Sequence, residues 1–247
     1  MSPLRPPPKA TKLTADAAQG AQSTDGLLLV DKPAGVTSHD VVLLARRVYR
    51  ERSIGHLGTL DPFATGLLVL LFGRSTRLAT FIVNEPKVYD ATIRFGSETA
   101  TDDRTGAVTR EAPLPDAASV RAALPALTGN IIQVPPAYSA KSVDGTRAYD
   151  AARRGEPLAL AAVKVLVHGW EVEAERSDEI DVRITCGGGT YIRALARDLG
   201  RAAGSAAHLS SLRRCRSGPF DVADAATLES LQTSPPALRQ LKVVADA

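Results

Sequence analysis

Cysteine is scarce in this chain, since only Cys186 and Cys215 are present. They stand too far apart to form the closely spaced ligand pairs of a zinc site. Two residues also cannot build the disulfide framework of a small secreted protein. We therefore expect reduced thiols, no bound metal and a cytoplasmic location.

Long apolar runs are missing as well. No stretch approaches the roughly 20 residues that a membrane-spanning helix needs. The first 22 residues, rich in proline, alanine and lysine, lack the apolar segment of a signal peptide. We expect no membrane partner. Residues 1–25 carry too little apolar surface to order themselves and are predicted to form a disordered arm.

Charge of one sign is not in large excess either. The formal net charge is +3, from 30 Lys and Arg residues against 27 Asp and Glu residues. A site for a polyanion must therefore come from local clustering of cations. The 247 residues are 44% hydrophobic, which is enough for a sizeable core in one or two domains.

Both helical and strand patterns are present. Thr37 and Asp40 have the spacing of a capping box and predict a helix over about residues 38–50. Residues 87–95, 163–174 and 179–185 alternate as strands do, and the last two predict an antiparallel pair. These periodicities predict a mixed α/β fold without specifying its topology.

The stretch at residues 55–66 combines a loop with a fixed carboxylate; it reads Gly-His-Leu-Gly-Thr-Leu-Asp-Pro-Phe-Ala-Thr-Gly. Pro62 fixes its own φ angle and restricts the backbone of Asp61, which therefore ends the loop in a defined conformation. The apolar run 67–72 that follows Gly66 is typical of a buried strand. A carboxylate on a stiff loop beside a core strand is a candidate catalytic group, although Asp-Pro pairs also occur in plain turns.

This stretch resembles the catalytic motif of the TruB family, the bacterial tRNA pseudouridine(55) synthases. The required positions are all present: Gly55, His56, Gly58, Leu60, Asp61, Pro62, Ala64 and Gly66. The resemblance implies that Asp61 is the catalytic residue and that His56 wedges into the RNA loop to hold it open. The alternative for His56 is a purely structural loop histidine.

Further segments, at residues 31–38, 87–89, 189–200 and 208–220, resemble the other motifs of the family in the same order. They imply that Lys32 supports the catalytic loop and that Tyr89 stacks on the target base, where a lone tyrosine would otherwise indicate a half-buried strand residue. Arg193 is expected to pair with Asp61, which keeps the carboxylate ionised and fixes its direction.

The same motifs supply candidate substrate contacts. Leu212 is expected to pack near the target uracil, and Arg213 and Arg214 add positive charge beside it. We include Lys32, Tyr191 and Arg213 among the substrate-binding residues. In the polar loop at residues 96–106, we expect Asp103 to shape the loop rather than take part in chemistry.

The resemblance covers residues 26–220 and implies a pseudouridine synthase fold. This is an α/β (α+β) domain with a mixed, mostly antiparallel central sheet flanked by helices. Residues 135–156 resemble the thumb that folds over RNA in stand-alone family members, with an Asp-Gly hairpin turn and a short helix. Residues 221–247 form a short C-terminal tail that is too short for the full RNA-binding PUA domain of many members.

Pseudouridine formation breaks the N1–C1′ bond, turns the uracil and rejoins it through C5, so no cofactor is required. Asp61 attacks C1′ or C6, or abstracts a sugar proton, after the base has left its stack. We predict an isomerase that acts on position 55 in the T stem-loop of tRNA, as a monomer without an obligatory protein partner. The alternatives are a guide-RNA-dependent synthase and a non-catalytic tRNA-binding or folding chaperone.

Overall fold

The computed structural model describes residues 25–139, 141–143, 145–156 and 158–240. The predicted N-terminal arm lies outside the described residues, except for Asp25, and so do residues 241–247 of the predicted tail. None of the described helices is long and apolar enough to cross a membrane.

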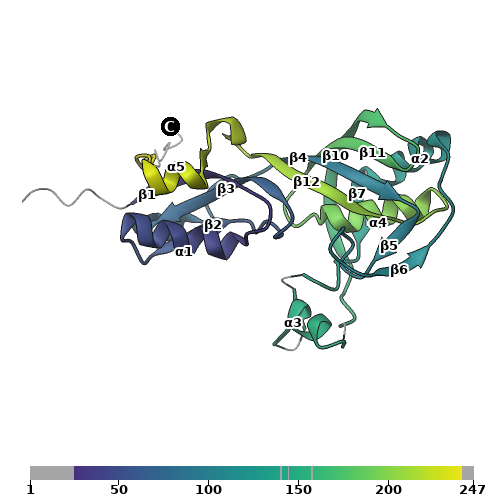
Figure 1. The fold of residues 1–247 in the computed structure, drawn as a ribbon, viewed down its shortest axis with the longest axis horizontal. Helices are drawn as coiled ribbons and strands as arrows, with labels where there is room; N and C mark the ends of the chain where they lie inside the picture. Colours follow the sequence, from purple (N-terminus) through teal and green to yellow (C-terminus); the bar gives the residue numbers. More distant parts are fainter. Residues whose placement is uncertain (1–24, 140, 144, 157, 241–247) are drawn as a thin grey trace, which may run out of the picture.

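A ten-stranded sheet forms the centre of the described molecule (Figure 1). Its strands are β1 (Gly26–Lys32), β2 (Ile54–Leu57), β3 (Thr65–Phe72), β4 (Lys87–Phe95), β7 (Gly129–Gln133), β10 (Val163–Glu175), β11 (Glu179–Cys186), β12 (Ala207–Ser217), β13 (Phe220–Asp221) and β14 (Ala226–Thr227). Their order is β14-β1-β3-β12-β4-β11-β10-β7, with β2 beside β3 and β13 beside β12. The β1–β14 and β3–β12 pairs are parallel and the other pairs antiparallel, which confirms the predicted mixed, mostly antiparallel sheet.

Four helices pack on one face of this sheet: α1 (Ser38–Tyr49), α2 (Ala117–Ala123), α4 (Ile192–Ala202) and α5 (Leu228–Thr233). The predicted capping box begins α1, since Asp40 N donates to Thr37 Oγ1 (3.0 Å) and Thr37 N donates to Asp40 Oδ2 (2.8 Å). Apolar residues of all four helices join the main hydrophobic core. A smaller apolar cluster covers the opposite face of β1, β2 and β3.

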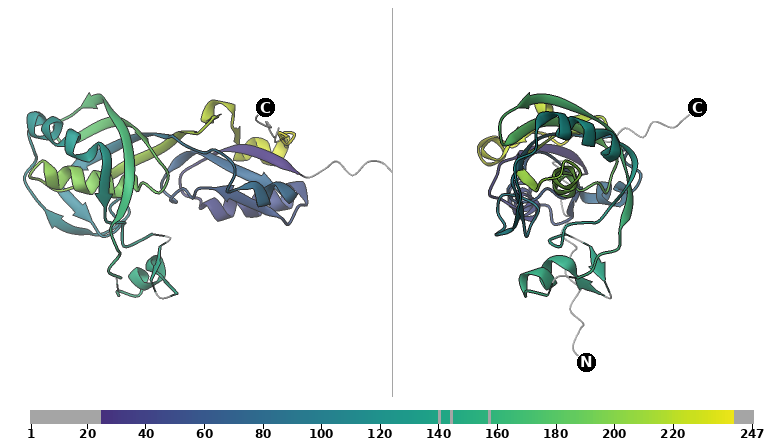
Figure 2. Two further views of the ribbon diagram at one scale, coloured as in Figure 1. Left: turned by 180° about the vertical axis from the view of Figure 1, so that it is seen from behind. Right: turned by 90° about the vertical axis from the view of Figure 1, so that its right-hand side faces the viewer.

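The sheet curves so that its two ends enclose different helices. Figure 1 shows α1 and α5 beside β1, β2 and β3 at one end, and Figure 2 shows α4 inside the curve of the strands at the other. The short hairpin of β5 (Ser97–Thr99) and β6 (Val108–Glu111) lies at the α4 end, and 3-10 turns span Gly73–Leu78, Leu124–Leu127 and Val222–Asp224. The β12 strand joins the ends, because it pairs with β4 and then, at Arg213 and Arg214, with β3.

The thumb projects away from this body (Figure 1). It contains β8 (Ser142–Val143), β9 (Thr146–Arg147) and α3 (Ala148–Arg153), in agreement with the predicted hairpin and short helix. The first residue of the predicted Asp-Gly turn, position 144, lies outside the described residues. Tyr138 and Tyr149 pack edge to face, with ring centroids 5.9 Å apart, which fixes α3 to the segment before the hairpin.

The segment after Phe220 is part of the same domain. The β14 strand pairs with β1, Leu231 of α5 is fully buried, and Arg239 exchanges two 2.9 Å main-chain hydrogen bonds with Leu27. The short C-terminal segment therefore completes the edge of the central sheet.

Candidate active site

A cavity of about 720 Å³ lies where the loop between β2 and β3, the strands β4 and β12, the thumb and the start of α4 meet. Residues from widely separated parts of the sequence line it. The structure brings together six of the eight predicted site residues here: His56, Asp61, Tyr89, Tyr191, Arg193 and Leu212.

Arg193 holds the carboxylate of Asp61 by two parallel hydrogen bonds. Its Nε donates to Oδ2 at 2.9 Å and its Nη2 donates to Oδ1 at 3.1 Å. The arginine side chain is 5% exposed, whereas the aspartate side chain is 34% exposed. Because a bidentate pair fixes direction as well as charge, Asp61 is an oriented carboxylate that remains open to the cavity.

The last residue of β1 and the first residue of α1 support the loop on both sides of Asp61. Ser38 Oγ accepts from Leu60 N (2.9 Å) and donates to Leu60 O (3.1 Å). Lys32 Nζ donates to Pro62 O (3.4 Å) and to the carbonyls of Pro33 and Val36. Both neighbours of the aspartate are therefore anchored through their main chain.

Lys32 itself is fully buried, although its three acceptors are neutral carbonyls. Burial lowers its pKa to about 8, and the nearby carboxylate of Asp61 opposes this shift in part. The side chain thus braces the catalytic loop through main-chain carbonyls.

Arg193 is in turn positioned by three further groups. Its Nη1 donates to Thr101 O (2.7 Å), and its Nη2 donates to Tyr138 O (2.8 Å) in the thumb. The carboxylate of Asp103 lies 3.8 Å from Nη1. Asp103 also accepts from the hydroxyls of Thr101 and Thr105, so it shapes the loop that holds the arginine.

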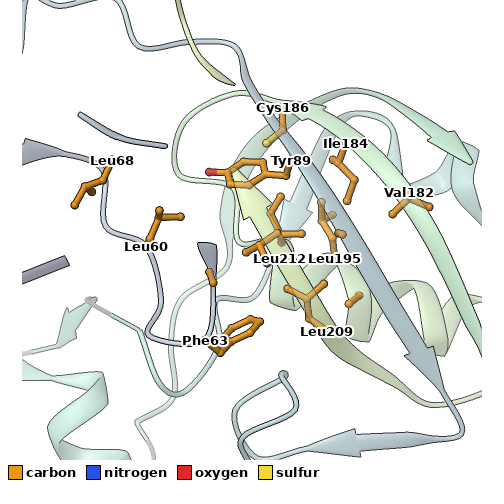
Figure 3. Close-up of a cluster of buried hydrophobic side chains, with 14 of the residues drawn as sticks. Leu60, Phe63, Leu68, Tyr89, Val182, Ile184, Cys186, Leu195, Leu209 and Leu212 are labelled. Carbon is orange, nitrogen blue, oxygen red and sulfur yellow. The ribbon is translucent and has the colours of Figure 1, made fainter. Parts of the chain in front are cut away.

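The floor of the cavity is apolar. Tyr89 on β4 and Leu212 on β12 line it, at 7% and 6% exposure. Figure 3 shows the Tyr89 ring packed between Cys186 and Leu212. Burial raises the pKa of the Tyr89 phenol, opposed in part by the Arg214 guanidinium, so the ring stays neutral. A neutral ring over an aliphatic side chain suits the stacking of an uncharged base.

His56 borders the cavity from β2, where it pairs with Leu70. Its Nδ1 atom is buried and has no hydrogen-bond partner among the described residues. Burial lowers the pKa of the imidazole, and the nearby charge of Arg214 adds to the effect. The ring is therefore neutral at pH 7 and keeps one unsatisfied polar atom.

Comparison with known proteins agrees with this geometry. Residues 46–192 match the TruB family pseudouridylate synthase N-terminal domain, and residues 193–240 match the tRNA pseudouridylate synthase B C-terminal domain. This chain belongs to the TruB family. Pseudouridine synthases are isomerases, so the predicted family, fold and enzyme class are all confirmed.

Relatives from several bacteria share much of the sequence. The tRNA pseudouridine synthase B of Arthrobacter sp. (strain FB24) is 50% identical, over 83% of this chain and 70% of its own length. That of Thermobifida fusca (strain YX) is 50% identical, over 84% of this chain and 74% of its own length.

Solved structures also resemble this TruB family chain. A Cbf5-Nop10-Gar1 complex contains a chain that is 29% identical with a TM-score of 0.64, covering 84% of this chain and 54% of that one. The chain from an archaeal box H/ACA sRNP Nop10-Cbf5 complex is 27% identical with a TM-score of 0.63. The match covers 84% of this chain and 53% of that one. This chain therefore spans about half the length of these structural relatives.

Two predicted substrate contacts lie outside the cavity of this TruB family site. Lys32 is buried beneath the loop. Arg213 instead forms a bidentate ion pair with Asp31, at 3.0 and 2.8 Å. Successive residues of a strand point to opposite faces, so Arg213 borders a separate hollow of about 420 Å³ while its neighbour Arg214 lines the main cavity.

Several residues that line the TruB family site are not among the predicted site residues. Arg214 was only noted as extra charge, and Lys87 only as part of a motif; both line the cavity. The thumb residues Tyr138 and Ser139 also reach it. The position of Lys87 two residues before Tyr89 indicates that it shares the cavity, because residues two apart on a strand point to the same face.

Proposed function

We propose that this chain converts the uridine at position 55 in the T loop of tRNA to pseudouridine, with Asp61 as the catalytic carboxylate. One observation carries the proposal: Arg193 orients the carboxylate of Asp61 toward a cavity with a base-stacking floor. Relatives that are 50% identical are tRNA pseudouridine synthase B enzymes, which supports tRNA as the substrate.

The flipped uracil lies between Tyr89 and Leu212, beside the Asp61 carboxylate. Asp61 either bonds to C1′ or takes a proton from the sugar as the N1–C1′ bond breaks and its electron pair goes to the uracil. The uracil then turns within the cavity, C5 bonds to C1′, C5 loses a proton and N1 gains one. When C5 bonds to C1′, the carboxylate leaves C1′ or the proton returns to the sugar, which restores Asp61. The atoms of substrate and product are the same, so no oxidant, reductant or group donor takes part. Enclosure keeps the free uracil in place and excludes water.

The thumb supports a stand-alone enzyme over the guide-RNA-dependent alternative. Tyr138 and Ser139 line the cavity, and the Tyr138 carbonyl bonds Arg193 at 2.8 Å. This chain therefore supplies its own cover for the site. A synthase that works alone on the T stem-loop, as a monomer, fits this arrangement.

Tritium release from uracil C5 tests the proposal. The purified chain, without guide RNA, cofactor or partner protein, is incubated with a T-arm stem-loop labelled at C5. We expect one tritium released per RNA, and an Asp61→Asn variant that binds the RNA and releases none. Release by that variant at the wild-type rate would overturn the role of Asp61. Binding without release by the wild type would favour the guide-dependent or chaperone alternative.

A further inference from the structure

Two cations flank Gly58 in the cavity, and neither forms an ion pair within the described part of the chain. The position that a Cβ atom would take on Gly58 lies 3.4 Å from both Arg214 Nη1 and Lys87 Nζ. Both side chains line the cavity. Among the described residues, no carboxylate oxygen lies within 4.0 Å of the charged nitrogens of either one.

Two carboxylates lie near these cations without forming an ion pair with either of them in the described residues. Asp61 is held by Arg193. The carboxylate of Glu85 lies against the Gly187–Gly188 turn, where a Cβ added to Gly187 would be 3.4 Å from its Oε2. The exposed Glu85 attracts the Lys87 charge from a distance, but within the described residues no carboxylate is in direct contact with Lys87 or Arg214.

The lack of a direct counter-charge matters because Arg214 is removed from water and Lys87 is partly buried. Arg214 is 1% exposed, and its guanidinium donates to two neutral carbonyls, those of Leu67 (2.8 Å) and Gly58 (3.0 Å). Burial lowers the pKa of Lys87 and the Arg214 charge lowers it further, while the charge of Glu85 opposes the shift in part. Buried charges are normally paired, so this pair of cations favours an anion supplied from outside the chain.

Strand geometry places this pair beside the floor of the cavity. Lys87 lies two residues before Tyr89 on β4, and Arg214 lies two residues after Leu212 on β12. Tyr89 and Arg214 are direct partners in the register of the two strands. Two residues along a strand span about 7 Å. The cations therefore sit one side-chain repeat beyond the two residues that enclose the base.

We propose that Lys87 and Arg214 bind a phosphate of the RNA backbone that flanks the target uridine. A phosphodiester is the only anionic group of a nucleotide, and it lies within a sugar's length of the base. The inference rests on the proposed function. It adds that the site grips the flipped nucleotide at two points, the base on the apolar floor and the phosphate on the cation pair.

The test uses stem-loops in which one flanking phosphate, 5′ or 3′ to the target uridine, is replaced by a neutral methylphosphonate. For the wild type, we expect kcat/KM of tritium release to fall about tenfold at one of the two positions, since a charge-assisted hydrogen bond is lost. Lys87→Met should lose about tenfold on the unmodified RNA. On the methylphosphonate RNA, the further loss of kcat/KM caused by Lys87→Met should be less than about twofold, because the phosphate charge that Lys87 binds is already absent.

Two variants provide controls. Lys164→Met removes an exposed lysine on β10, outside the cavity, and should behave as the wild type on all three RNAs. Lys87→Arg restores a cation and should recover most of the lost activity, which also shows that the fold tolerates a change at this position. Arg214 is left intact, because its hydrogen bonds to Gly58 and Leu67 also hold the loop.

If the loss from Lys87→Met and the loss from the methylphosphonate multiply at both RNA positions, the proposal would be overturned. A loss confined to kcat in Lys87→Met, with KM unchanged and no coupling to either phosphate, would also overturn it and point to stabilisation of the departing uracil anion instead. An inactive wild type on unmodified RNA would contradict the proposed function itself. The failures of the two proposals are therefore distinguishable.

Discussion

Asp61 and Tyr138 accept hydrogen bonds from the same atom, Nη2 of Arg193, at 3.1 and 2.8 Å. One acceptor is the candidate catalytic carboxylate and the other is a main-chain carbonyl at the base of the thumb. A shift of the thumb that moves this carbonyl therefore changes the direction in which Arg193 holds Asp61. The cover of the site and its reactive group are joined through one guanidinium.

Replacement of Arg193 by lysine should separate charge from orientation. Lysine keeps the positive charge but lacks the planar guanidinium that binds both carboxylate oxygens at once. Because Asp61 loses its fixed direction, kcat for tritium release should fall by roughly a hundredfold, with RNA binding less affected. Arg94→Lys, at an arginine that is 53% exposed and paired with Asp178, is the control and should retain full activity. A fully active Arg193→Lys enzyme would show that the bidentate contact is dispensable.

Gln133 should be essential for the geometry at the start of α4. The fully buried amide accepts from Tyr191 N (2.9 Å) and donates to Tyr191 O (3.1 Å). In Gln133→Leu, Tyr191 N loses its partner while Tyr191 O keeps only the bond from Leu195 N (3.1 Å), so the free energy of unfolding should fall by about 1–3 kcal/mol. The kcat value should fall as well, because Arg193 lies two residues further on.

Denaturant unfolding and tritium release measure the two effects of Gln133→Leu. Asn130→Leu changes an exposed amide on the same strand and serves as the control. A Gln133→Leu protein with unchanged stability would mean that water replaces the amide at no cost.

The lowered pKa of Lys32 predicts an unusual dependence of stability on pH. Burial lowers its pKa from 10.5 to about 8. Between these values, the unfolded chain binds a proton that the folded chain has lost, so stability rises with pH. Relative to Lys32→Met, the wild type should gain roughly 1 kcal/mol of unfolding free energy per pH unit between pH 8 and pH 10.

Chemical denaturation of the wild type and Lys32→Met at pH 7.5, 9 and 10 checks this expectation. Titrations of all other groups occur in both proteins and cancel in the difference. A difference that does not change with pH would show that Lys32 keeps its proton beneath the loop.

Gly66 and Gly35 form a matched pair for testing how closely β3 approaches β12. Both have positive φ angles, +101° and +87°. A Cβ on Gly66 would lie 2.8 Å from Arg214 N, whereas a Cβ on Gly35 would meet nothing within 4 Å. Gly35→Ala should cost roughly 1–2 kcal/mol from backbone strain alone. Gly66→Ala should cost roughly 3 kcal/mol or more, because a steric clash is added.

Thermal and denaturant unfolding measure both alanine variants. Equal losses in the two would mean that β3 can move away from β12 freely. In that case, the loop that ends at Gly66 would not be tied to Arg214.

Local sequence anticipated the features that depend on short-range geometry. The Thr37–Asp40 capping box begins α1 because its hydrogen bonds link residues only three apart. Pro62 restricts Asp61 wherever the loop is placed. The pairing of Arg193 with Asp61, 132 residues away, was expected only through resemblance to the TruB family, and the structure contains it.

The choice between two adjacent arginines shows what local sequence does not contain. Arg213 and Arg214 are equivalent as residue types, but the pairing of β12 with β3 and β4 turns only Arg214 toward the cavity, while Arg213 meets Asp31. Gln133 likewise looks like an ordinary strand residue until α4 packs against it.

The sequence by itself determined the family, the catalytic loop and the mixed α/β class, because motifs, caps and hydrophobic periodicity are properties of neighbouring residues. The tertiary structure alone decided which side chains share the cavity. It buried Lys32 as a brace, excluded Arg213, and brought Lys87 and Arg214 together around Gly58. Those outcomes depend on strand register and burial, since the face that a strand residue presents is set by partners distant in the chain.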